Sequence, residues 1–169
     1  MYCNQKRNAM CLYLKEAKLN VAKKDIKCYK VIMRRNPSPV YTTPCRFAPI
    51  VFNAVTTAKR ENHRVKVDAF DKCVLKFSPF LMIGDGAIHS YKSLTEAKRS
   101  AKRFSVSNPY TEYAVAECII PKGTPYYEGN DIIKCDYVDD AVEVLIDNKQ
   151  YASHSIIYKE IVEKYKSKK

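Results

Sequence analysis

Hydrophobic and polar residues alternate along much of the chain with the two-residue period of β-strands. The segment 64–70 shows the clearest alternation, with Val65, Val67 and Ala69 on one side and charged residues on the other. The segment 26–33 is rich in the β-branched and aromatic types that strands favour. The same criteria predict further strands at 49–53, 73–77, 87–91, 113–120, 141–146 and 155–162, separated by turn-forming residues at 84–86, 121–124 and 147–148.

One segment has the three-and-four spacing of an amphipathic helix, which we expect over residues 94–104. Ser93 and Glu96 form a capping box at its start. A second, weaker helix is expected within residues 14–24, where apolar positions four apart share one face. Together these elements predict an α+β fold, with a compact, mainly antiparallel or mixed β-sheet and one or two short helices.

The length of 169 residues suits a single domain spanning residues 1–169. Four prolines predict a protruding loop at residues 36–49. The lysine-rich end predicts a frayed basic tail at residues 164–169.

Composition narrows the class of protein further. With 28% charged residues and no apolar run approaching 18 residues, the sequence predicts a soluble protein without a membrane span. The first ten residues lack the apolar core of a secretory signal, which predicts a cytoplasmic protein. The seven cysteines are widely spaced and include no C-x2-4-C pair, so we expect free thiols and no bound metal.

The net charge of +12 points to an anionic partner, either nucleic acid or an acidic protein. The surplus is concentrated in the first two thirds of the chain. Residues 1–110 hold 22 basic and seven acidic side chains, whereas residues 111–169 hold eight and eleven.

The predicted helix carries the strongest candidate binding surface, a cationic patch formed by Lys98, Arg99, Lys102 and Arg103. Tyr91 and Tyr110 flank it in sequence and would supply stacking surfaces for bases. The alternative is that these cations only solvate the outer face of an amphipathic helix.

Sequence motifs of common catalytic sites are absent. The chain contains no Walker A loop, GxGxxG, GxSxG or HExxH motif, and its four glycines cannot supply a glycine-rich phosphate loop. These absences favour a binding protein without catalysis.

Four segments taken in order resemble the core of the ADP-ribosyltransferases: 27–31 (KCYKV), 86–93 (GAIHSYKS) followed by a helix, 115–127 around IPKGT, and 151–162. In that family the first strand presents an arginine or histidine to NAD, a later strand carries a serine-threonine-serine motif, and a strand near the end carries the catalytic glutamate. The resemblance implies NAD as a cofactor.

By this resemblance Lys30 takes the first position, and His89, Ser90 and Ser93 take the second. The segment 150–155 has no glutamate at the third position. The nearest glutamates in sequence are Glu143 and Glu160.

The same segments, with the triplets HSY at 89–91 and YAS at 151–153, are also similar to small uncharacterised proteins of gut anaerobic bacteria and their phages. That similarity implies an accessory protein, associated with a phage or mobile element, in the cytoplasm of a bacterial host. Two hypotheses result. The first is a basic protein that binds a polyanion or an acidic partner without a cofactor, and the alternative is an ADP-ribosyltransferase-like, NAD-binding enzyme or its degenerate relative.

Overall fold

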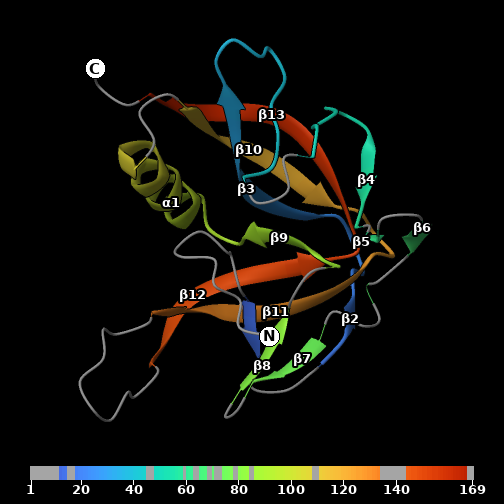
Figure 1. The fold of residues 1–169 in the computed structure, drawn as a ribbon. Coiled ribbons are helices and arrows are strands. Elements are labelled where there is room, and N and C mark those ends of the chain that lie inside the picture. Colours follow the sequence, from blue (N-terminus) through green and yellow to red (C-terminus); the bar gives the residue numbers. More distant parts are fainter. Residues whose placement is uncertain are drawn as a thin grey trace.

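The computed structural model describes residues 12–14, 18–44, 48–58, 60–62, 65–67, 70, 74–77, 80–83, 86–107, 111–133 and 144–166. Within these ranges the chain forms thirteen strands and one helix (Figure 1). Eleven of the strands join into one sheet whose named pairs are all antiparallel. The prediction of a mainly antiparallel sheet is confirmed, and the fold is richer in strand than the predicted α+β arrangement.

In the large sheet, strands that follow one another in the sequence are often not adjacent. The strand order is β4 (Val55–Thr57), β13 (Ser155–Tyr165), β10 (Thr111–Ile120), β3 (Ile26–Arg35), β9 (Ile88–Tyr91), β12 (Val144–Ser153), β11 (Pro125–Ile133), β1 (Leu12–Leu14), β8 (Phe80–Ile83) and β7 (Val74–Phe77). The short β2 (Asn20–Val21) also pairs with β11, while β5 (Arg60–Asn62) and β6 (Val65–Val67) form a separate two-stranded sheet. The helix α1 spans Leu94–Ser107.

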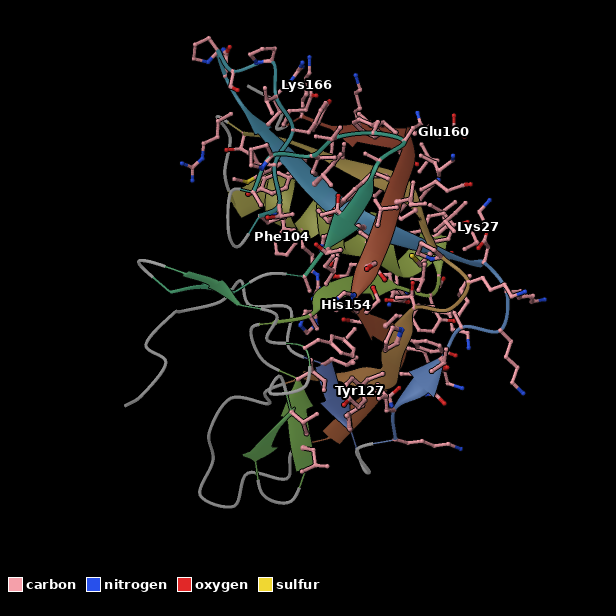
Figure 2. The ribbon with its side chains drawn as sticks, turned by 90° about the vertical axis from the view of Figure 1, so that its right-hand side faces the viewer. Lys27, Phe104, Tyr127, His154, Glu160 and Lys166 are labelled. Atoms are coloured by element: carbon pink, nitrogen blue, oxygen red, sulfur yellow. The ribbon has the colours of Figure 1, made fainter. Side chains whose placement is uncertain are left out.

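A corner at His154 joins the two halves of the large sheet. β12 ends just before His154 and pairs with β9 and β11, whereas β13 begins just after His154 and pairs with β10 and β4. The backbone N–H of His154 donates to the carbonyl oxygen of Pro125 at 3.0 Å, and its own carbonyl oxygen accepts from Ala58 at 2.7 Å. Figure 2 shows His154 at this corner. Because only this residue separates β12 from β13, one nearly continuous stretch of chain contributes to both halves.

The central strands β3 and β10 are covered on both faces. On one, which we call the helix face, alternate residues of both strands pack against Ala97 and Ala101 of α1: Val31, Met33, Tyr113 and Val115. On the other, which we call the cysteine face, the intervening residues pack against Tyr41, Ile50 and Tyr158: Cys28, Ile32, Ala114, Ala116, Cys118 and Ile120. This double burial explains why both strands are dominated by apolar side chains.

Several predicted element boundaries are corrected by the structure. The helix continues one turn past residue 104 to Ser107. The described part of the weaker predicted helix contains no helix, since Leu14 ends β1 and residues 18–24 include strand β2. The turn predicted at 147–148 lies inside β12, and β13 continues through Lys164 and Tyr165, where a frayed tail was predicted to begin.

The proline-containing segment 36–49 lies partly against the sheet. The Thr42 backbone exchanges hydrogen bonds with Met33 at 2.8 and 2.9 Å and forms a bridge with Pro49. Tyr41 is buried and joins the cysteine-face core. Residues 45–47 lie outside the described residues.

Within the described ranges, the structure contains no helix with the length and apolar composition that crossing a membrane requires.

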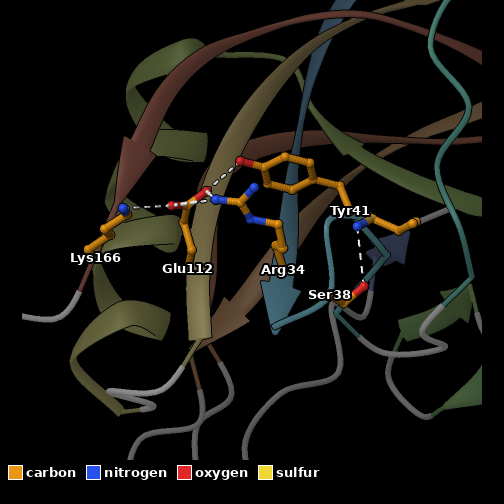
Figure 3. Close-up of polar contacts among 6 residues, drawn as sticks. Arg34, Ser38, Tyr41, Glu112 and Lys166 are labelled. Atoms are coloured by element: carbon orange, nitrogen blue, oxygen red, sulfur yellow. Dashed lines mark hydrogen bonds and ion pairs between the residues drawn. The ribbon is translucent and has the colours of Figure 1, made fainter. Parts of the chain in front are cut away.

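A buried carboxylate connects the ends of three elements at one edge of the cysteine face (Figure 3). Glu112 at the start of β10 accepts a hydrogen bond from the Tyr41 hydroxyl at 2.5 Å and pairs with Arg34 at 3.1 Å and Lys166 at 3.4 Å. Burial alone raises the pKa of the Glu112 carboxyl, but the Tyr41 hydrogen bond and the two cations outweigh it and hold the pKa below its ordinary value. Glu112 is therefore ionised at neutral pH.

We expect Glu112→Gln to lower the free energy of unfolding by about 1–3 kcal/mol at pH 7, because the buried Tyr41 hydroxyl and the half-buried Arg34 lose a charged acceptor. The native pKa lies below the ordinary value, so the carboxylate's contribution is present above the unfolded pKa and is lost as the pH falls through the native pKa. Urea unfolding at pH 7 and at about pH 3 measures both effects.

The matched control is Glu128→Gln, which breaks the more exposed pair with Lys92 and is expected to cost about 0–1 kcal/mol. Equal losses from the two variants at pH 7 would contradict a special role for Glu112.

Candidate functional site

Three contacts hold α1 against the helix face of the sheet. The Tyr91 hydroxyl of β9 donates to Ser100 Oγ at 2.7 Å. The Phe104 ring lies 5.6 Å from that of Tyr113 on β10. Lys98 pairs with Glu163 of β13 at 2.5 Å. The buried contacts with β9 and β10, together with the packing of Ala97 and Ala101 on the sheet, fix the rotation of α1 about its axis.

The four predicted cations all lie on the side of α1 that faces away from the core. Ala97, Ser100, Ala101 and Ser105 are buried, whereas Arg99, Lys102 and Arg103 are exposed and Lys98 is half-buried. Lys98 and Lys102 are one turn apart, as are Arg99 and Arg103, so the cations form two adjacent rows. We call this group of four the cationic half of α1.

Acidic neighbours partly neutralise the cationic half. Glu163 pairs with Lys98, and Glu96 pairs with Arg99 at 2.9 Å within the helix. Arg103 donates to Ser100 Oγ at 3.2 Å, and Lys102 is exposed and has no acidic partner among the described residues. Both ion pairs lie at the surface, with side chains between 23% and 64% exposed, so each contributes little to stability and its cation can pair with another anion.

The predicted stacking surface is not formed by Tyr91. Its side chain is 1% exposed and lies beneath α1, bonded to Ser100. The second predicted aromatic, Tyr110, lies outside the described residues.

The structure brings together three of the residues assigned to the alternative nucleotide site. Lys30 Nζ on β3 donates to the carbonyl oxygen of His89 on β9 at 2.5 Å. Tyr29 pairs with Tyr91, and extending that register by one residue places Ser90 beside Lys30. Burial raises the pKa of the nearby Cys28 thiol to about 11, and Ser90 and Lys30 offset part of that rise. These groups form a buried polar region on the cysteine face.

The other residues assigned to the alternative site do not join this region in the described structure. Ser93 is exposed just before α1, and Glu160 is exposed on β13, which is separated from β3 by β10. Figure 2 shows Glu160 toward the outer edge of the molecule. Glu143 lies outside the described residues.

Sequence reasoning missed two buried polar residues close to this region. Gln150 and Ser153 on β12 are fully buried, and the Gln150 amide and the Ser153 hydroxyl have no hydrogen-bond partner in the described structure. Their place within a strand was the missing signal, since the sequence predicted a turn at 147–148 and no strand over residues 149–153. Cys28 and Cys118 face each other across β3 and β10 as free thiols, and no group of three candidate metal ligands is found among the described residues.

No family model matches the chain, and neither the curated proteins nor the solved structures contain a match. Any function is therefore argued from the arrangement of the residues themselves.

We expect Tyr91→Phe to lower the free energy of unfolding by about 0.5–1.5 kcal/mol, because it removes the buried hydrogen bond to Ser100. Chemical denaturation followed by circular dichroism measures the change. The control Tyr126→Phe removes a hydroxyl from β11, away from α1, and keeps the ring contact with Tyr151. A larger loss in the control would contradict the anchoring role of Tyr91.

Proposed function

We propose that the protein binds a polyanion through the cationic half of α1, without catalysis. The observation that carries the proposal is the fixed orientation of α1, which directs Lys98, Arg99, Lys102 and Arg103 to the solvent side of the helix. Because buried contacts with β9 and β10 hold the helix, the four cations are presented as an ordered array.

The overall charge of the protein supports the same function. The net charge of +12 attracts an anionic partner over a distance, and an ordered cationic array then offers short-range contacts. The two ion pairs beside the array lie at the surface, and their cations are the more exposed partners, so a more highly charged ligand can take the place of the acids.

We expect the double variant Lys102→Glu/Arg103→Glu to elute from a heparin column at a much lower salt concentration than the unchanged protein. Heparin supplies dense negative charge without bases, so retention of the protein on the column reports on the polyanion contact alone. Both substitutions are at exposed positions. Arg103→Glu also removes the hydrogen bond from Arg103 to Ser100 Oγ, so thermal unfolding of the double variant is measured alongside its retention.

The matched control is Lys23→Glu/Lys24→Glu, which lowers the net charge equally at exposed positions between β2 and β3. In Figure 1, β2 and the connection that follows it lie at the right of the ribbon, whereas α1 lies at the left. Equal shifts for the two double variants would show that retention follows total charge, and would overturn the assignment to α1.

A second candidate function rests on the contact between Lys30 and His89. These residues, with Ser90, come from the two strands that the ADP-ribosyltransferase resemblance assigned to nucleotide binding. Such an enzyme needs a carboxylate near the ribose to balance the positive charge that develops as nicotinamide leaves. Glu160 is exposed and two strands away, so this candidate is the weaker of the two.

We expect no release of nicotinamide when the purified protein is incubated with NAD, because the described region around Lys30 contains no such carboxylate. Chromatographic detection of free nicotinamide, compared with a protein-free incubation, measures this. Release that disappears in Glu160→Gln or Glu143→Gln would promote the enzyme hypothesis.

A further inference from the structure

We infer that the polyanion bound by the cationic half of α1 is a nucleic-acid duplex, held through its phosphates and independently of base sequence. This inference rests on the proposed function and specifies its partner. Three features of the described surface distinguish a duplex from an acidic protein and from a single strand.

The first feature is the lack of apolar anchors on the exposed side of α1. Protein partners gain most of their affinity from buried aromatic or aliphatic side chains surrounded by a polar rim. Val106 is the only large apolar side chain that the described helix exposes, and its neighbours on that side are cations. A surface of this kind obtains its affinity from charge, which is how proteins bind the phosphate backbone.

The second feature concerns aromatic side chains. Single-stranded nucleic acid is held by aromatic rings on which its bases stack. Among the residues whose burial the structure describes, every aromatic side chain is buried or half-buried. The half-buried rings near α1, those of Tyr29, Phe104 and Tyr165, pack against the core of the helix face. Close to α1, Tyr91 is buried beneath the helix and Phe104 packs against Tyr113. This surface can therefore contact phosphates and has no described platform for unpaired bases.

The third feature is the density of charge on the helix. Residues 98–103 span about 7.5 Å along the axis of α1. Double-stranded DNA carries about one charge per 1.7 Å, so a length equal to this span contains about four phosphates, against about two for one strand. Four cations in two adjacent rows therefore match the phosphate density of a duplex better than that of a single strand.

The acids beside the array give the inference a specific signature. In the free protein Lys98 is paired with Glu163, and Arg99 is paired with Glu96. A duplex must therefore displace the two acids from their cations. Glu163→Gln and Glu96→Gln should therefore each strengthen duplex binding, by about twofold to fivefold for exposed pairs of this kind. A purely structural role for these pairs would give no gain.

The test measures fluorescence anisotropy of the full chain with a labelled 20-base-pair DNA duplex, the corresponding RNA duplex and a 20-nucleotide single strand, over a range of salt concentrations. We expect both duplexes to bind at least fivefold more tightly than the single strand, and a shuffled duplex to bind equally well. Lys102→Glu/Arg103→Glu should reduce the magnitude of the salt slope by about two, since each lost phosphate contact removes about 0.9. Lys23→Glu/Lys24→Glu should leave the slope nearly unchanged.

The possible results separate this inference from the proposed function. Equal or tighter binding of the single strand, with loss of binding in Lys102→Glu/Arg103→Glu, would overturn the duplex assignment and leave polyanion binding in place. If the protein binds no nucleic acid but its retention on heparin depends on the helix, the duplex assignment is likewise overturned and polyanion binding is kept. Heparin retention that does not depend on the helix would overturn both. Thermal unfolding of each variant identifies any change that results from loss of the fold.

Discussion

The burial of β10 on both of its faces is the constraint on which the rest of the structure depends. From Glu112 to Ala116 each residue of this strand is buried, so both faces need cover. Small alanines on the cysteine face let Tyr41, Ile50 and Tyr158 approach closely, while Tyr113 and Val115 on the helix face form the surface on which α1 rests. If one face of the strand were exposed, its apolar side chains would destabilise the fold by roughly 25 cal/mol for each Å² of apolar surface left in water. The positions of α1 and of the segment around Tyr41 are therefore consequences of one strand's composition.

The orientation of α1 follows from that packing. The residues of the helix that contact the sheet are small or apolar, so the remaining positions must face solvent, and four of those positions are cations. Glu163, on the neighbouring β13, adds a contact at the side of the helix through Lys98. The packing of α1 therefore places its four cations together on the solvent side of the helix. The array needs no cleft, which suits a ligand that is itself an extended, regularly charged surface.

The elements that the sequence could predict are those in which local pattern and tertiary environment agree. The capping box at Ser93 located the start of α1, and the β-branched residues of 26–33 located β3. β11 was missed because Gly129 and Asn130 interrupt its apolar residues, and its strand conformation comes from pairing with β12 and β1. The predicted turn at 147–148 coincides with a register shift between β11 and β12, so turn-forming residues are accommodated as an irregularity within a strand. The pairing of Lys98 with Glu163 joins residues far apart in the chain, which no local pattern encodes.

The two candidate sites are separated by the thickness of the sheet but share the strand β9. Ser90 lies beside the buried Lys30 on the cysteine face, whereas Tyr91, the next residue, holds Ser100 of α1 on the helix face. Consecutive residues of a strand point to opposite faces, so this division follows from backbone geometry alone. The buried ammonium group of Lys30 and the exposed cations of α1 therefore cannot act on one ligand at once. Because the same four-residue strand contributes to both, the backbone of β9 determines where α1 is anchored and where the carbonyl oxygen of His89 meets Lys30.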